Sequence, residues 1–122
     1  MIIGIGSDIV KISRIEALLV SHKQRFLHRI FTSNELSLLN NKRLSSYVAK
    51  RFAAKEAFSK ALGTGIGKSL SFKDIEIFTK TSGEPYFEIS SRVKNKYNAI
   101  KAHLSMTDEA EYAQAFVIIE ER

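Results

Sequence analysis

The chain of 122 residues contains no cysteine and only one proline. Without cysteine it can form no disulfide bond and no zinc or iron–sulfur site that depends on thiolate ligands. No apolar run approaches the ~20 residues that a membrane-spanning helix needs, and the strongest run covers only residues 115–119. Asp8 and Lys11 interrupt the apolar residues at the start of the chain, so no secretory signal is expected there. These absences predict a soluble, cytoplasmic protein without a membrane partner.

Composition and charge narrow the class of protein. Hydrophobic residues make up 44% of the chain and charged residues 26%, which is typical of a globular protein rather than a disordered one. No linker, repeat or low-complexity segment divides the sequence, so residues 1–122 are expected to form a single domain. The 19 Lys and Arg residues exceed the 13 Asp and Glu residues, giving a net charge of +6. This excess favours an acidic partner, which could be nucleic acid, a phosphate-rich small molecule or an acidic protein.

A long helix is predicted from residue 46 to residue 62, followed by a glycine-rich turn at 63–67. Apolar residues recur at helical spacing in it: Val48, Phe52, Phe58 and Leu62. We expect Ser45 or Ser46 to cap its start and Gly63 to end it in the left-handed conformation. Because the glycine-rich turn follows the helix, it lies at the negative end of the helix dipole. The turn is therefore not a phosphate-binding loop of the kind that precedes a helix.

A second face of this helix carries small residues, which would let another group approach the backbone. Its members fall at steps of three and four: Ala49, Ala53, Glu56, Ala57 and Lys60. Glu56 and Lys60 place a carboxylate and an ammonium group one turn apart. The plain interpretation is an exposed ion pair that stabilises the helix by about 0.3–0.5 kcal/mol. The alanines around the pair favour the alternative, a site with room above it.

Shorter elements surround the central helix. In chain order we expect a buried strand at 1–10, a helix at 11–20, a basic connector at 21–29, a helix at 33–39 capped by Thr32 or Ser33, hairpin strands at 71–80 and 85–89, a helix at 91–100, and strands at 103–106 and 112–120. Helices and strands do not alternate strictly. The pattern predicts an α+β fold in which a mainly antiparallel sheet packs against the long central helix.

Asp8 is a charged residue within the apolar run of the first strand. A buried carboxylate costs free energy unless it is paired or bound to a metal ion. The alternative is that Asp8 caps the next element or lies in a turn.

Three stretches together resemble a known family. They are GIGSDIVKISRIE at 4–16, RFAAKEAFSKALGTGIG at 51–67 and HLSMTDEAEYAQAFVIIE at 103–120. The chain resembles the bacterial holo-acyl-carrier-protein synthases, the small, single-module class of 4′-phosphopantetheinyl transferase. The middle stretch carries the family's most specific motif, an aromatic residue followed by x-x-K-E-A-x-x-K, from Phe52 to Lys60. The resemblance runs from the first residues to the last.

The resemblance implies an activity and its cofactor. Members of the family move 4′-phosphopantetheine from coenzyme A to a serine of apo acyl carrier protein, which leaves adenosine 3′,5′-bisphosphate and supports fatty acid biosynthesis. The family's motif Asp and motif Glu bind Mg²⁺, which assigns Asp8 and Glu56 as metal ligands here. The motif Lys, here Lys60, contacts phosphate, and Glu56 and Lys60 are the expected catalytic residues. Whether a metal-bound water held by Glu56 or a carboxylate removes the serine proton stays open.

The resemblance also implies how the substrates bind. The expected contacts to coenzyme A come from Lys42, Arg51, Lys60, Gly63, Gly65 and His103. The basic first helix of the family docks the acidic carrier protein, which implies Arg14 and, with a weaker match, Arg25. The family assembles as a homotrimer with the active site at the subunit boundary. Asp108 stands where some relatives have histidine and is assigned no role.

Two other classes of function would explain part of the sequence. A small nucleic-acid-binding module would explain the net charge, but it leaves Asp8 and Glu56 unexplained, and the aromatic pattern of RNA-binding modules is missing. A metal-dependent phosphohydrolase would use water in place of the carrier's serine. The sequence favours the transferase and predicts no nucleic-acid partner.

Overall fold

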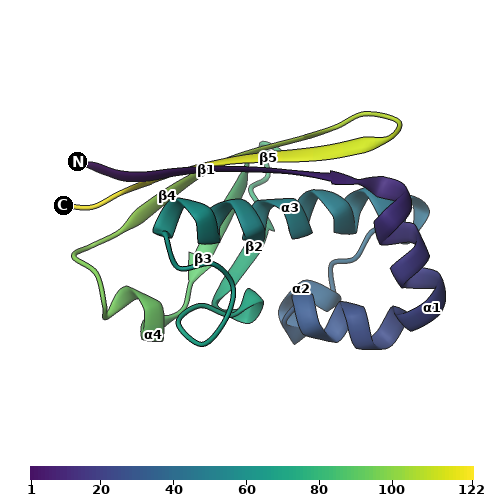
Figure 1. Cartoon of the computed structure of the whole chain (residues 1–122), viewed down its shortest axis with the longest axis horizontal. Helices are drawn as coiled ribbons and strands as arrows, with labels where there is room; N and C mark the ends of the chain where they lie inside the picture. Colours follow the sequence, from purple (N-terminus) through teal and green to yellow (C-terminus); the bar gives the residue numbers. More distant parts are fainter.

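The helix α3 (Leu44–Leu62) runs through the middle of the computed structural model, which describes all of residues 1–122 (Figure 1). An antiparallel sheet of three strands covers one side of α3, in the order β1 (Ile2–Lys11), β5 (Tyr112–Glu120) and β4 (Lys101–Asp108). A separate antiparallel pair, β2 (Ile75–Thr79) and β3 (Pro85–Ile89), packs on the other side. This arrangement confirms the predicted α+β fold with antiparallel sheets around a long central helix.

The remaining elements are helical and connect these parts. They are α1 (Ile12–Ile30), α2 (Ser33–Leu36), the 3₁₀ turns η1 (Asn41–Arg43) and η2 (Phe72–Asp74), and α4 (Ser91–Lys94). Figure 1 shows α1 leaving the end of β1 and descending at one end of α3, with α2 below α3. None of these helices combines the length and the apolar character needed to cross a membrane.

The small-residue face of α3 is buried against β1. Ala49, Ala53 and Ala57 have no exposed surface. A methyl group added to Gly4 or Gly6 would overlap the backbone carbonyl of Ala61 or Ala57, respectively, so the strand lies directly on the helix backbone. The sequence predicted a close approach to this face, and the group that makes it is a strand of the same chain.

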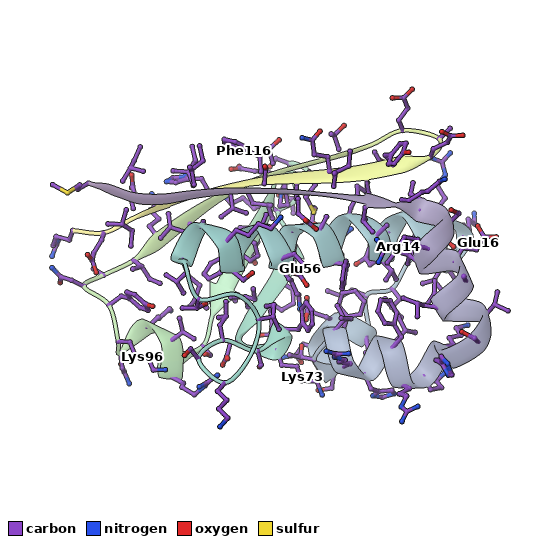
Figure 2. The ribbon with its side chains drawn as sticks, in the orientation of Figure 1. Arg14, Glu16, Glu56, Lys73, Lys96 and Phe116 are labelled. Atoms are coloured by element: carbon purple, nitrogen blue, oxygen red, sulfur yellow. The ribbon has the colours of Figure 1, made fainter.

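The prediction that β1 is buried holds for one face only. Side chains alternate along a strand, so Gly4, Gly6 and Val10 face α3 while Ile5 and Ile9 face outward and are each 61% exposed. Other large apolar side chains on the outer face of this sheet are also exposed: Ile3, Tyr112 and Phe116. Figure 2 shows Phe116 pointing away from α3. Continuous apolar sequence suggested burial on both faces, but the single chain covers only one.

The basic segment 21–29, predicted to be a connector, is helical. It continues α1, with a kink at His22, where φ is −143° and ψ is 43°. The buried Leu27 and Ile30 extend the apolar stripe that begins with Ile15 and Leu19, which gives the segment a face to pack. The kink shifts the helical phase, and this shift hides the periodicity in the sequence.

Several predicted boundaries also differ. The helix at 33–39 ends at Leu36, the helix at 91–100 ends at Lys94, the strand at 71–80 starts at Ile75, and the strand at 103–106 extends over Lys101–Asp108. Arg43, not a serine, precedes α3 and makes no side-chain cap. The caps at Thr32 and Gly63 are confirmed: Thr32 forms a capping box with Glu35, and Gly63 ends α3 with φ of 84°.

We expect Gly6→Ala to destabilise the protein by about 1–3 kcal/mol, the usual cost of overpacking, because the added methyl group would push β1 away from Ala57. Gly67→Ala is the matched control, since nothing lies within 4 Å of a methyl group there and its φ is not positive. Urea unfolding of both variants measures the difference. Equal stability of the two would contradict the close contact between β1 and α3.

Candidate active site

Asp8, Glu56 and Lys60 meet along one side of the contact between β1 and α3. Asp8 follows Gly6 by two residues, so it projects from β1 on the side that faces the helix. The ammonium group of Lys60 donates to the Asp8 Oδ1 at 2.9 Å and to the carbonyl oxygen of Ser7 at 3.1 Å. Side chains of a helix lean toward its N-terminus, which brings Lys60 back over the turn that carries Glu56. The structure therefore brings these three residues together, and the roles expected of them stay predictions.

Glu56 is held in a half-buried position among these charges. Its pKa is raised, chiefly by burial and then by the nearby Asp8 carboxylate, while Lys60 and Arg29 act in the opposite direction. Asp8 and Lys60 differ in access, since their side chains are 19% and 54% exposed. Figure 2 shows Glu56 in the middle of α3. Two neighbouring carboxylates with an exposed ammonium group beside them form an arrangement that a cation and an anionic ligand can share.

The donor set fits a hard cation that keeps most of its own water. Nowhere in the chain do three or more His, Cys, Asp or Glu side chains gather as a metal cage. Mg²⁺ commonly takes only one or two protein carboxylates and completes its shell with waters and substrate phosphate. Asp8 and Glu56 supply two carboxylates from different elements, and the electrostatic strain between them is what a divalent cation would relieve.

The glycine-rich turn after α3 lies directly beyond Lys60. Gly63 and Gly65 adopt positive φ angles of 84° and 67°, and both are exposed. The carbonyl of Ser59 accepts hydrogen bonds from the amides of Gly63, Thr64 and Gly65, which folds the turn over the end of the helix. This part of the predicted site for coenzyme A is thus close to Lys60.

Two other predicted contacts lie elsewhere on the chain. Lys42 is in η1, before α3, and borders a hollow of about 550 Å³. The 19 residues of α3 span about 28 Å, and this length separates Lys42 from the glycine turn. His103 projects from β4, 3.6 Å from Glu120, and borders a hollow of about 580 Å³ between β3 and β4. One chain therefore does not bring Lys42 and His103 to Lys60.

Arg51, expected to contact phosphate, is buried in the single chain. Its guanidinium stacks 3.6 Å from the centre of the Tyr47 ring, and its Nη1 donates to the Tyr47 carbonyl at 3.4 Å. Burial lowers its pKa, and its Nε has no hydrogen-bond partner. The tyrosine ring covers the group that was expected at the surface, so a direct contact of Arg51 with phosphate stays a prediction.

The two arginines predicted to dock a protein partner both lie exposed on α1. Arg14 is in the first turn, and Arg25 follows the kink, where it borders a hollow of about 410 Å³. Sequence reasoning missed Arg29, whose positive charge acts on Glu56. The kink at His22 hid it, because it interrupts the apolar periodicity that would have shown the helix continuing to residue 30 and bringing its last turn to α3.

Fold and site together define a transferase class. The sequence model of the 4′-phosphopantetheinyl transferase superfamily matches residues 4–117, so the chain belongs to this superfamily of enzymes. A holo-[acyl-carrier-protein] synthase of Ruthia magnifica is 48% identical over 98% of each chain. The closely similar solved structures include the synthase of Neisseria meningitidis, 40% identical with a TM-score of 0.90 over 99% of this chain and 100% of that one.

A third relative carries a ligand. The holo-(acyl-carrier-protein) synthase of Bacillus anthracis, solved in complex with CoA (3′,5′-ADP), is 43% identical and superimposes with a TM-score of 0.86. The alignment covers 100% of this chain and 99% of that one. The coverage is complete for this chain and nearly complete for the relative, so the similarity extends over the whole architecture.

We expect Glu56→Gln to raise the thermal midpoint at pH 7.5 in the presence of a chelator. The folded-state pKa of Glu56 lies above its ordinary value of 4.5, so its carboxyl favours folding below that pH, and this contribution is lost as the pH rises through the folded-state pKa. The gain from the substitution should therefore shrink toward pH 4. Asp8→Asn is the comparison: it breaks the ion pair with Lys60 and should give no gain. Thermal unfolding, monitored by circular dichroism, tests both variants, and a lower midpoint for Glu56→Gln at pH 7.5 would contradict the destabilisation of the Glu56 carboxylate by burial and by Asp8.

Proposed function

We propose that this enzyme is a holo-acyl-carrier-protein synthase that transfers 4′-phosphopantetheine from coenzyme A to a serine of apo acyl carrier protein. The observation that carries the proposal is the meeting of Asp8, Glu56 and Lys60 on one edge of the β1–α3 contact, within a chain that matches the family from end to end. The products are holo carrier protein and adenosine 3′,5′-bisphosphate. Cytoplasmic location and a role in fatty acid biosynthesis belong to the same proposal.

Each residue of the site has a proposed task. Asp8 and Glu56 would hold Mg²⁺, which when bound neutralises charge on the pyrophosphate of coenzyme A. Lys60 is exposed and ion-paired, so it can exchange Asp8 for a phosphate oxygen. Gly63 and Gly65 leave the space beyond Lys60 free of side chains. The nucleophile is the serine of the carrier protein, which is why the chain needs no serine nucleophile of its own.

We propose that the complete site forms in a homotrimer. Lys42 and His103 lie away from Lys60 in one chain, so they reach the same coenzyme A only from a neighbouring copy. The outer face of the three-stranded sheet supplies a surface for association, since it exposes the large apolar side chains of Ile5, Ile9 and Phe116. The number of subunits follows the family resemblance. Sedimentation equilibrium should give three times 13.8 kDa, and a fully active monomer would contradict this proposal.

The transfer itself is tested with purified protein, coenzyme A, Mg²⁺ and apo carrier protein. Mass spectrometry should show the carrier gaining one phosphopantetheine group, and the gain should disappear for Glu56→Gln. Release of free phosphopantetheine without modified carrier would instead indicate a phosphohydrolase. No change in either substrate would contradict an enzyme of this kind and leave a binding module.

We propose that α1 docks the acidic carrier through Arg14 and Arg25. Opposite surface charges mainly raise the rate of encounter and fix orientation, and salt screens them, since the Debye length falls from ~10 Å at 0.1 M to ~3 Å at 1 M. Figure 2 shows Arg14 on α1 and Lys96 beside α4, at opposite ends of the molecule. This separation provides a matched control for charge reversal.

We expect Arg14→Glu to raise KM for the carrier protein at least tenfold, equivalent to ~1.4 kcal/mol, while KM for coenzyme A changes little. The effect should weaken at high salt. Lys96→Glu makes the same charge change on an exposed residue and should leave both constants unchanged. Steady-state kinetics with each substrate varied in turn decides the matter; equal effects of the two variants would remove Arg14 from the docking surface.

A further inference from the structure

The side chain of Lys55, the residue before Glu56, is completely buried and joins three separate segments. Its Nζ donates to the carbonyl oxygen of Ile30 at 2.8 Å, to the carbonyl oxygen of Phe72 at 3.0 Å and to Glu35 Oε1 at 2.7 Å. All three protons of the ammonium group therefore have an acceptor. The acceptors belong to α1, η2 and α2, so one side chain of α3 ties together elements that are distant in sequence.

Glu35 extends this cluster to the second sheet. Its Oε2 accepts a hydrogen bond from the amide of Ile77, in β2, at 2.9 Å, and its Oε1 accepts one from the amide of Thr32 at 3.1 Å. Glu35 is only 3% exposed and Lys55 is 0% exposed. The Lys55–Glu35 cluster is thus a buried ion pair in which each charge is fully hydrogen-bonded.

A buried ion pair is a costly way to stabilise a core. Desolvating two charges often outweighs their attraction, and well-packed apolar residues of similar volume commonly stabilise a protein as well or better. The pair instead provides geometric specificity, because each hydrogen bond requires a particular position and orientation of its partner. The cluster therefore fixes how α1, α2 and β2 lie relative to α3.

The element that this cluster fixes most directly is the end of α1. Ile30 is the last residue of α1. The positive charge of its neighbour Arg29 acts on Glu56 and lowers the pKa of that carboxyl, against the larger effects of burial and Asp8. Lys55 binds the end of α1 through the Ile30 carbonyl, and it belongs to α3, the helix that also carries Glu56 and Lys60. The docking arginines and the catalytic carboxylate are thereby set at a defined distance from each other.

We infer that Lys55 is a positioning residue for the carrier protein: its contacts with Ile30 and Glu35 align the docking helix α1 with Glu56, so that the incoming serine is presented to the site. This inference rests on the proposed transfer to a carrier protein. Of the residues expected to contact coenzyme A, Lys60 and the glycine turn follow Lys55 along α3 and form no hydrogen bond with the cluster, whereas the charge of Glu35 acts on the buried Arg51. Loosening the cluster should therefore affect one substrate far more than the other.

The test uses the double substitution Lys55→Met with Glu35→Gln, which removes both charges together and leaves no isolated buried charge. The glutamine oxygen can still accept the Ile77 amide. We expect kcat/KM for the carrier protein to fall at least tenfold, while KM for coenzyme A stays within about twofold of the wild-type value. High salt should not reproduce this loss in the wild-type enzyme to the same extent, because the cluster is shielded from solvent.

A control for stability is available in the same fold. Asp74 ends η2 and accepts hydrogen bonds from the Ser71 amide, the Ser90 hydroxyl and Arg92, none of which belongs to α1, α2 or α3. Asp74→Asn weakens this second buried cluster and should lower the thermal midpoint without changing the ratio of the two substrate constants. If it shifts the ratio as the double variant does, loss of stability explains both and the inference fails.

The outcomes separate the inference from the function on which it depends. Wild-type enzyme that modifies no carrier protein contradicts the proposed function itself. Active wild type with a folded double variant that keeps both constants, or loses both equally, contradicts only the role of Lys55. If the double variant does not fold, hydrogen exchange on the wild type decides: carrier binding should slow exchange of the Ile77 amide, and an unchanged rate would overturn the inference.

Discussion

The close contact between β1 and α3 is the constraint on which the rest of the structure depends. Gly4 and Gly6 have no side chains, and the alanines of α3 are small, so the strand rests on the backbone of the helix. A larger side chain on either surface would push the two elements apart, because even a methyl group at Gly4 or Gly6 overlaps the helix backbone. Asp8, near the start of the chain, and Lys60, near its middle, would then no longer be within hydrogen-bond distance.

The charges of the site follow from that contact. Burial and then the nearby Asp8 carboxylate raise the pKa of Glu56, while Lys60 and Arg29, near the end of α1, supply positive charge. We propose that a cation and a phosphate of the substrate complete this arrangement, and the related synthase of Bacillus anthracis was solved in complex with CoA (3′,5′-ADP). The buried Lys55–Glu35 cluster has the opposite character, since every polar atom of its ion pair is already matched by the protein.

Much of this could be predicted from the sequence, because local patterns determine it. Helical spacing located α3, Gly63 ended it, and the single charge within the apolar run of the first strand singled out Asp8. The kink at His22 could not be predicted, since it changes the helical phase and made a helix resemble a connector. The burial of Lys55 was hidden as well: its acceptors are two carbonyls and a carboxylate that only the tertiary fold assembles. Burial of β1 was overestimated because its outer face is apolar but uncovered in a single chain.

The most direct measurement is the affinity for Mg²⁺ in the presence of coenzyme A, determined by titration calorimetry. It compares wild type with Asp8→Asn, Glu56→Gln and the double variant. If β1 and α3 build one site between them, each single substitution should weaken Mg²⁺ binding by roughly tenfold or more, about 1.4 kcal/mol, and the two losses should not add. Wild-type affinity in either single variant would show that the two carboxylates do not act together, and would contradict the central claim.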